Sequence, residues 1–261
     1  MIKDHFGKTY QKIVAELDKK KGLAFLVIDP PNQEPKLAGK LAQIAESNNF
    51  GAIAIGGSVG AEGKLLEETL QEIKDNCKLP RVLFPGNIST LSANADAIYF
   101  MSMLNSTDPY YITGAQIASS SSIKRIKLEA IPTSYIIVEP GRAVGWMGKA
   151  KLIPRDVPYL AAITALAGQY MGAHWAILES GGGAPEPAPL EMISFTKKMI
   201  DIPLIVAGGV RTPDWAYKVI KAGADIIHIG AAIEATNGDL KKADSRISEF
   251  SKAVEKAARE K

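Results

Sequence analysis

Short apolar runs alternate along the chain with segments in which apolar residues recur every three or four positions. A continuous apolar run predicts a strand buried on both faces, whereas the wider spacing predicts a helix with one buried side. Turn residues follow most of the runs. The predicted strands are Leu23–Ile28, Ala52–Ile55, Arg81–Phe84, Ala97–Met101, Ser134–Val138, His174–Leu178, Pro203–Ala207 and Asp225–Ile229.

Helical spacing precedes, separates and follows these strands. One start is marked by Thr212, Pro213 and Asp214, which supply a cap, a first-turn proline and a first-turn acid. The residues from 142 to 154 are expected to form a loop. Only residues 89–94 join the third and fourth strands, which is too short for a full crossover helix. The predicted helices are Asp4–Lys20, Leu37–Asn48, Glu62–Cys77, Tyr110–Ser119, Asp156–Met171, Glu191–Lys198, Thr212–Ala222 and Asp239–Arg259.

Strand and helix units in this number favour an α/β fold, a single (β/α)₈ TIM barrel with an irregular third unit. A doubly wound open sheet is the competing arrangement. Gly208 and Gly209 follow the seventh strand and Gly230 follows the eighth. The loops at these places in a barrel commonly hold a phosphate, and glycine lets backbone N–H groups approach an anion. The glycines therefore favour the barrel and a phosphorylated substrate.

Composition narrows the class of protein further. The chain has 261 residues, and α/β barrels reach this length as one domain, so residues 1–261 are expected to form a single domain. The net charge of +3 comes from basic residues interleaved with acids, which gives no case for nucleic acid. One cysteine, Cys77, excludes an internal disulfide framework. Because no apolar run approaches the roughly twenty residues that span a bilayer, we expect a cytoplasmic protein.

Polar residues at strand ends are the candidates for chemistry, since active sites of barrels lie on that face. Asp29 could bind Mg²⁺ together with substrate phosphate oxygens, or it could cap the following turn. Ser58 could supply a second oxygen ligand or be a simple turn residue. Glu179 could accept a hydroxyl proton as general base, or form a salt bridge across the barrel mouth. The glycines from 181 to 183 could wrap an anion or form a flexible loop.

Other polar and aromatic residues have weaker functional readings. Glu139 could brace Arg142 or another cation, and Trp146 could contact a partner subunit or cover substrate. The histidines lack metal-ligand spacing, and His174 and His228 are interpreted as core residues. A basic stretch after the fifth strand could face a diphosphate or be solvated surface; it comprises Arg142, Lys149, Lys151 and Arg155.

Ordered motifs through nearly the whole chain match one family. They include Leu26–Pro30, Ile55–Ser58, Leu83–Gly86, Phe100–Ser106, Tyr111–Gln116, Pro132–Gly141, Gly145–Gly148, Leu152–Asp156, Leu178–Pro185 and Ile205–Pro213. On these segments the chain resembles the geranylgeranylglyceryl phosphate synthases, within a wider group of prenyltransferases that includes the bacterial PcrB-type enzymes. The segments Phe100–Ser106 and Pro132–Gly141 resemble the second archaeal branch.

The resemblance implies a modified (β/α)₈ barrel that transfers a geranylgeranyl group from geranylgeranyl diphosphate to the sn-3 hydroxyl of sn-glycerol 1-phosphate. This reaction forms the first ether bond of archaeal membrane lipids. The resemblance also implies Mg²⁺ held by Asp29 and Ser58, and a homo-oligomer that is a dimer or a hexamer. It implies contact with a membrane surface only through the lipid substrate or product. The implied acceptor site comprises Ile177, Leu178, Glu179, Ser180, Gly181, Gly182, Gly183, Gly208, Gly209, Gly230 and Ala231.

The chain departs from the usual family pattern at three positions. Ile177 stands where tyrosine is frequent, Pro31 where aspartate is usual, and Ala231 where asparagine is common. Two alternatives remain: another phosphate-handling barrel enzyme such as an isomerase or lyase, and an inactive scaffold that binds a lipid phosphate. The candidate lining of a groove for the prenyl chain is Tyr99, Met101 and Met103, of which strand alternation is expected to turn only some toward the groove.

Overall fold

Eight parallel strands close into a barrel in the order β1 to β8, with β8 pairing back to β1. The structure is a computed structural model that describes residues 6–57 and 59–261. The closed barrel confirms the predicted fold class and excludes the open sheet. The strands are β1 (Leu23–Ile28), β2 (Ala52–Gly57), β3 (Arg81–Pro85), β4 (Ala97–Met103), β5 (Glu129–Ile137), β6 (Trp175–Glu179), β7 (Leu204–Ala207) and β8 (Ile226–Ile229).

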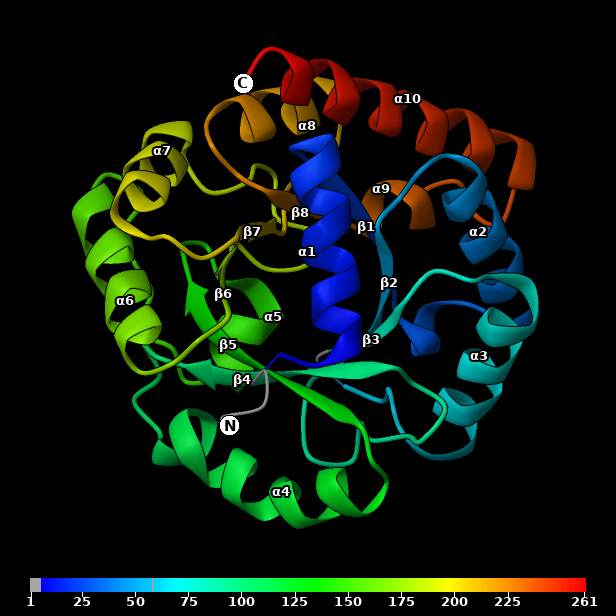
Figure 1. Cartoon of the computed structure of the whole chain (residues 1–261), viewed down its shortest axis with the longest axis horizontal. Helices are drawn as coiled ribbons and strands as arrows, with labels where there is room; N and C mark the ends of the chain where they lie inside the picture. Colours follow the sequence, from blue (N-terminus) through cyan, green and yellow to red (C-terminus); the bar gives the residue numbers. More distant parts are fainter. Residues whose placement is uncertain (1–5, 58) are drawn as a thin grey trace.

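Helices surround the barrel on its outside (Figure 1). The crossovers confirm most predicted helices, with ends shifted by one or two residues at several places. They are α2 (Pro35–Ser47), α3 (Gly63–Asn76), α4 (Ala115–Arg125), α6 (Pro158–Tyr170), α7 (Leu190–Met199), α8 (Pro213–Lys221) and α10 (Leu240–Arg259).

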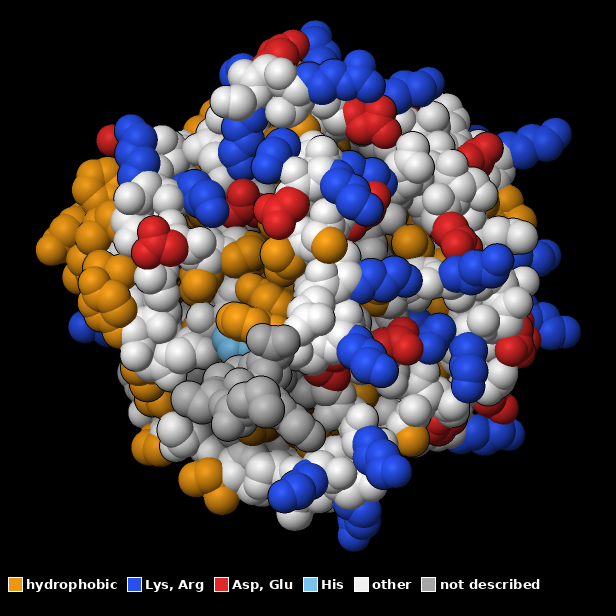
Figure 2. Space-filling model, viewed as in Figure 1, with side chains coloured by type: hydrophobic (Ala, Val, Ile, Leu, Met, Phe, Trp, Pro, Cys, Tyr) orange, Lys and Arg blue, Asp and Glu red, His pale blue; other side chains and the backbone are white. Residues whose placement is uncertain are grey.

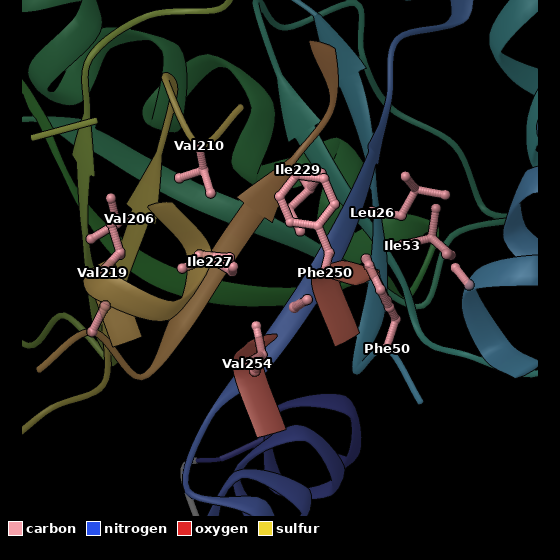
Figure 3. Packing of buried hydrophobic residues seen from close by; sticks show 14 of the residues in the cluster. Leu26, Phe50, Ile53, Val206, Val210, Val219, Ile227, Ile229, Phe250 and Val254 are labelled. Carbon is pink, nitrogen blue, oxygen red and sulfur yellow. The ribbon is translucent and has the colours of Figure 1, made fainter. Parts of the chain in front are cut away.

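Strand alternation divides the core into two parts. Side chains such as Phe25, Tyr99 and Trp175 point into the barrel, whereas their strand neighbours point outward to the helices. Figure 3 shows part of the outer layer, where Phe250 and Val254 of α10 lie beside residues of β1, β2 and β8. The barrel is therefore packed with side chains at its centre, and an internal site must lie at one of its ends.

The first helix, α1 (Lys8–Lys20), crosses the barrel at the amino ends of the strands (Figure 1). Its buried side carries Tyr10, Ile13 and Leu17. Backbone N–H groups of Thr9 and Tyr10 each donate to the Glu129 carboxylate at 2.8 Å. These donors belong to the first turn, where no partner within a helix exists, so Glu129 fixes α1 over this pole.

The connection between β3 and β4 contains no helix, which confirms the irregular third unit. Asp96 organises this connection, because its Oδ1 pairs with the Arg81 guanidinium at 2.8 Å and its Oδ2 accepts from the Arg81 N–H at 2.8 Å. Ser92 and Asn94 both donate to the Glu67 carboxylate at 2.9 Å. These polar contacts thus hold the connection between β3 and β4, which has no helix, against α3 and β3.

The loop expected from residue 142 to 154 is partly wrong, because it opens with a short helix, α5 (Arg142–Met147). Gly145 lies inside this helix, and glycine lowers helix propensity. A Cβ at Gly145 would lie 3.0 Å from Leu152 Cδ2, so close packing accounts for glycine here. Two further short elements were not predicted, a turn of 3₁₀ helix at Pro30–Asn32 and α9 (Ala231–Glu234). The segment predicted as Tyr110–Ser119 is a π-helical turn, Tyr110–Gly114, that continues into α4.

The surface around α1 mixes charges of both signs, as Figure 2 shows for this face. Apolar side chains gather instead at the edge formed by α6 and α7, where Tyr159, Leu160 and Phe195 are exposed. Within the described part of the chain, no helix is long and apolar enough to cross a membrane.

Candidate active site

A cavity of about 640 Å³ opens at the carboxyl ends of the strands. Asp29 follows β1, Gly57 ends β2, Glu179 ends β6, and Gly208 and Gly230 follow β7 and β8; all of them line the cavity. The strand-end residues therefore meet on one rim, as expected from a barrel. Apolar side chains from β3 and β4 and from the segment before α4 line the rest of the cavity.

Glu179 is the carboxylate at the base of this cavity, and its side chain is buried, with 5 % exposed. Its Oε1 accepts a hydrogen bond from the Gly181 N–H at 2.6 Å, and its Oε2 from the Tyr135 hydroxyl at 3.4 Å. Burial raises the pKa of Glu179 to about 7, although both hydrogen bonds favour its ionised form. Among the described residues no cation pairs with Glu179, so the alternative of a salt bridge across the barrel mouth is not supported.

Gly208 is required where it lies, because the loop after β7 passes directly beside Glu179. Its φ is +74°, and a Cβ there would lie 2.4 Å from Glu179 Oε1. The next residue, Gly209, also has a left-handed φ, +75°, and a Cβ would collide with the backbone of Glu186. The pair brings bare backbone to the rim next to the carboxylate, an arrangement suited to an anion.

Asp29 lies on the other side of the same opening. Its Oδ1 is buried and has no hydrogen-bond partner among the described residues, and a Cβ at Gly57 would lie 2.2 Å from it. Burial, and secondarily the charge of Glu234, raise the pKa of Asp29 to about 6. A carboxylate oxygen without a partner, beside a second acid, fits a divalent cation. Ser58, the other predicted ligand, lies outside the described residues.

The surroundings of Asp29 contain few other metal ligands. Glu234 of α9 lines the cavity and accepts from Asn32 Nδ2 at 3.2 Å. In the described ranges no three His, Cys, Asp or Glu side chains come close enough to hold a metal together. A cation at Asp29 would therefore need oxygen ligands from the substrate as well, as is usual for Mg²⁺ bound with phosphates.

The predicted acceptor-site residues divide into two groups. Glu179, Gly182, Gly183, Gly208, Gly209, Gly230 and Ala231 line the cavity. Ile177 and Leu178 are buried within β6, Ile177 inside the barrel and Leu178 toward the helices. Ser180 is fully buried, and Gly181 acts by holding Glu179. The family segment thus contains both cavity lining and the support beneath it.

Tyr99, Met101 and Met103 all line the cavity. The expectation that only some of them would face it was wrong, because residues two apart on a strand share a face. Gly148, which follows α5, packs tightly against this row of β4 side chains, since a Cβ at Gly148 would lie 2.3 Å from Met103 Cε. Three large side chains of β4 therefore form one wall of the cavity.

Aromatic rings cover the floor of the cavity. Phe84 of β3 contacts Tyr99, Tyr135 and His228, with ring centroids 5.3 to 5.7 Å apart. His228 is 4 % exposed, and its Nε2 lies 2.9 Å from the Tyr99 hydroxyl. Burial lowers the pKa of His228 to about 3. Its interpretation as a core residue is correct for burial, but it also lines the cavity, and its Nδ1 has no partner among the described residues.

The basic stretch after β5 does not reach the cavity. Lys149 pairs with Asp108 at 2.8 Å, and Arg155 pairs with Glu186 at 3.4 Å, both near the surface. Glu139 does not brace Arg142; its Oε2 accepts from the backbone N–H of Arg155 at 3.4 Å. These residues, with Lys151, support the alternative of solvated surface.

Three further residues complete the comparison with the sequence. Trp146 on α5 is 81 % exposed, and His174 packs against the rings of Phe6 and Tyr10. Arg211, which was not predicted, contributes the one cationic side chain found in the lining among the described residues. No sequence pattern distinguishes Arg211 from other arginines, but its position two residues after Gly209 could have marked it.

Residues 16–254 match the model of the PcrB family. The chain belongs to the PcrB family. The chain is 52 % identical over 230 residues to a protein named geranylgeranylglyceryl phosphate synthase from Pyrococcus abyssi, and the match covers 88 % of this chain and 91 % of the relative. The Pyrococcus horikoshii synthase is 50 % identical over 241 residues, covering 92 % and 94 %.

A solved structure of the PcrB family shares the fold and carries a ligand. It is (S)-3-O-geranylgeranylglyceryl phosphate synthase from Thermoplasma acidophilum in complex with the substrate sn-glycerol-1-phosphate. The TM-score is 0.88 at 33 % identity, covering 94 % of this chain and 98 % of that one. The Thermoplasma volcanium enzyme also gives a TM-score of 0.88, at 36 % identity, with 94 % and 97 % covered.

Proposed function

We propose that this chain transfers a geranylgeranyl group from geranylgeranyl diphosphate to the sn-3 hydroxyl of sn-glycerol 1-phosphate. The observation that carries the proposal is the position of Glu179, a buried carboxylate with a pKa raised to about 7, between glycine turns and an apolar cavity wall. Its relatives are named for this activity, and one of them is solved with sn-glycerol-1-phosphate bound.

The acceptor would be held by the glycine turns. Backbone at Gly208, Gly209 and Gly230 lines the rim and can approach a phosphate without side chains in the way. Holding the phosphate fixes the position of the glycerol hydroxyls above Glu179. Such positioning replaces a bimolecular encounter with a reaction inside one complex, which is a large part of many enzymatic rate gains.

Glu179 would act as the general base. An ether bond forms between the sn-3 oxygen and carbon 1 of the prenyl chain, the bond from that carbon to the diphosphate breaks, and diphosphate leaves. The hydroxyl proton passes to Glu179, and from there to solvent after the product departs. Hydrogen bonds from Gly181 and Tyr135 hold the carboxylate in place, and its raised pKa makes it a stronger base than an ordinary glutamate.

The donor's diphosphate requires charge compensation, and Asp29 with Ser58 would hold Mg²⁺ for that purpose. The bound ion would supply electrostatic stabilisation of the leaving diphosphate. Asp29 fits this role because its Oδ1 is buried without a partner in the described residues. The apolar wall of Tyr99, Met101 and Met103 would accommodate part of the prenyl chain.

The direct test is a Mg²⁺-dependent assay with radiolabelled sn-glycerol 1-phosphate and donors of ten, fifteen and twenty carbons. We expect the labelled lipid product, most rapidly with the twenty-carbon donor, and loss of activity with a chelator. Binding of glycerol phosphate without product would favour an inactive scaffold. Metal-independent turnover of a small sugar phosphate would favour an isomerase or lyase.

Asp29→Asn tests the metal site separately from turnover. We expect it to weaken binding of Mn²⁺, followed by paramagnetic resonance in the presence of inorganic pyrophosphate. Glu191→Gln, at an exposed acid at the start of α7, is the control. Unchanged Mn²⁺ binding in Asp29→Asn would remove the proposed metal site.

A homo-oligomer, either a dimer or a hexamer, is part of the proposal. It is supported by large apolar side chains that remain exposed on one chain, among them Trp146 at 81 % and Tyr159 at 56 %. Contiguous exposed apolar patches often mark a contact with another protein.

A further inference from the structure

His228 occupies the same layer of the barrel as Glu179. In the strand register Glu179 pairs with Ala207, and Val206 pairs with Ile227, so the next step along both strands sets Ala207 beside His228. All three residues line the cavity. Because alanine is small, it leaves room between the carboxylate on β6 and the imidazole on β8. His228 and Glu179 therefore line the same cavity from two strands that are separated by one small residue, Ala207 of β7.

The Tyr99 hydroxyl is the hydrogen-bond partner of one ring nitrogen of His228, and the donor and acceptor roles in this pair depend on the tautomer of the ring. Tyr99 is fully buried, and His228 Nε2 is the partner recorded for its hydroxyl, at 2.9 Å. When the Tyr99 hydroxyl is the donor, Nε2 accepts. A neutral imidazole has one N–H, which is then at Nδ1. Burial keeps the ring neutral, since it lowers the pKa of His228 to about 3.

The Nδ1 atom is a buried polar atom without a partner in the described part of the structure. A buried donor left without an acceptor destabilises a protein, and such atoms commonly mark a place where a ligand or water completes the bonding. The surrounding rings of Phe25 and Phe84 offer no acceptor oxygen. A hydroxyl oxygen of a bound molecule would meet this requirement.

We propose that His228 binds the acceptor substrate by donating from Nδ1 to the hydroxyl next to the reacting one, the C2 hydroxyl of the glycerol phosphate. This inference rests on the proposed function, because it takes the acceptor and the role of Glu179 from it. Glu179 accepts the proton of one hydroxyl, and His228 donates a hydrogen bond to the neighbouring hydroxyl, while the glycine turns hold the phosphate. Three contacts of different chemistry then select a polyol monophosphate and fix which hydroxyl reaches the prenyl carbon.

The test measures binding rather than turnover, with two ligands and three proteins. The ligands are sn-glycerol 1-phosphate and 3-hydroxypropyl phosphate, which lacks the C2 hydroxyl, and calorimetry gives Kd for each. The wild-type chain should bind the glycerol ester roughly three- to tenfold more tightly, the range of one neutral hydrogen bond. In His228→Phe this ratio should fall to about one, with the Kd of 3-hydroxypropyl phosphate little changed. Ile226→Val, at an inward-facing residue one layer deeper on β8, should keep the wild-type ratio.

A second measurement applies even if His228→Phe does not fold. Nitrogen-15 NMR of the imidazoles should show the Nδ1–H tautomer for His228, and its Nδ1 resonance should shift with sn-glycerol 1-phosphate but not with 3-hydroxypropyl phosphate. Tyr99→Phe removes the hydroxyl that bonds to Nε2, so His228 should no longer be held as the Nδ1–H tautomer. The ratio of the two Kd values should therefore fall. An Nε2–H tautomer in the wild-type chain, or a ratio that His228→Phe leaves intact, would overturn the inference. Absence of any glycerol phosphate binding and turnover in the wild-type chain would instead overturn the proposed function.

Discussion

The Gly181 backbone nitrogen lies 2.6 Å from Oε1 of Glu179, two residues earlier in the chain. Gly181 has a φ of +97°, a conformation that glycine adopts without strain, and this turn directs its N–H back at the carboxylate. The same carboxylate oxygen lies against Gly208 on the neighbouring loop. Two glycine-containing loops therefore fix the candidate base.

Replacing the candidate base should slow the reaction without removing the acceptor site. Glu179→Gln keeps an oxygen that can accept from Gly181, so the side chain should stay in place. Loss of a general base lowers kcat by roughly 10²–10⁴-fold. Initial rates at saturating substrates measure this loss, with Glu186→Gln at an exposed acid as the control. Full activity of Glu179→Gln would remove Glu179 from the base role.

The pH dependence should follow the raised pKa of Glu179. Only the ionised carboxylate can accept a proton, so kcat/KM should rise with pH through about 7 and then level off. In Glu179→Gln the residual rate should lack this rise. A wild-type profile that is flat between pH 5 and 8 would show that another group accepts the proton.

Stability should change with pH in the opposite direction. The folded-state pKa of Glu179 is above its ordinary value of 4.5, so the folded chain binds the proton more tightly than the unfolded chain. Stability from this group is present below about pH 4.5 and is lost as pH rises to about 7. At pH 8, Glu179→Gln should therefore be more stable than wild type by roughly 1–3 kcal/mol. Urea unfolding of both proteins at pH 4 and 8 measures the difference, which should vanish at pH 4.

A methyl group at Gly208 should disturb the base. Gly208→Ala combines a left-handed φ with a Cβ 2.4 Å from Glu179 Oε1. We expect kcat to fall at least tenfold, because displacement of a positioned group by about 1 Å is costly. Gly172→Ala is the matched control, since Gly172 also has a left-handed φ, +96°, but no atom lies within 4 Å of its added Cβ. Equal losses in both variants would assign the effect to backbone strain alone.

The wall on β4 should influence which donors are used. Met101→Trp adds volume to a side chain that lines the cavity, so kcat/KM should fall more for the twenty-carbon donor than for the ten-carbon donor. Competition between the two donors in one assay gives this ratio directly. Met171→Trp, at a side chain that is 70 % exposed, should leave the ratio unchanged. The same ratio in both variants would place the prenyl chain elsewhere.

The exposed tryptophan on α5 should contribute to assembly. Trp146→Ala removes a large apolar side chain that is 81 % exposed, and we expect a smaller assembly by light scattering. Tyr170→Ala, at the last residue of α6, which is 79 % exposed, is the comparison. If only Tyr170→Ala reduces the mass, the contact between copies lies at α6 rather than at α5.

The barrel and its rim could be predicted from sequence because both depend on local signals. Continuous apolar runs identified every strand, and the glycines after β7 and β8 marked the rim at which the cavity opens. Glu179 was found because a glutamate at the end of an apolar run is poorly explained by packing. The role of Ser58 remains a prediction, since it lies outside the described residues.

Other features depend on contacts between distant residues, which no local pattern carries. Tyr135 and Glu179 are 44 residues apart, and Tyr99 and His228 are 129 apart. Glu234 was missed because the four-residue helix α9 has too short a pattern to detect. Helix α5 was missed because Gly145 lowers the helix propensity of this segment. The close packing against Leu152 that accounts for glycine at this position is visible only in the folded structure.

The placement of α1, fixed over the amino pole by the Glu129 carboxylate, has a consequence for the reaction cycle. Because α1 covers the amino pole, a prenyl chain that enters through the carboxyl pole must also leave through it. A bound product lipid would then block binding of the next prenyl donor until the product dissociates. Product release would then limit the rate of such an enzyme. A bilayer or detergent micelle that takes up the lipid product should therefore increase the rate of turnover.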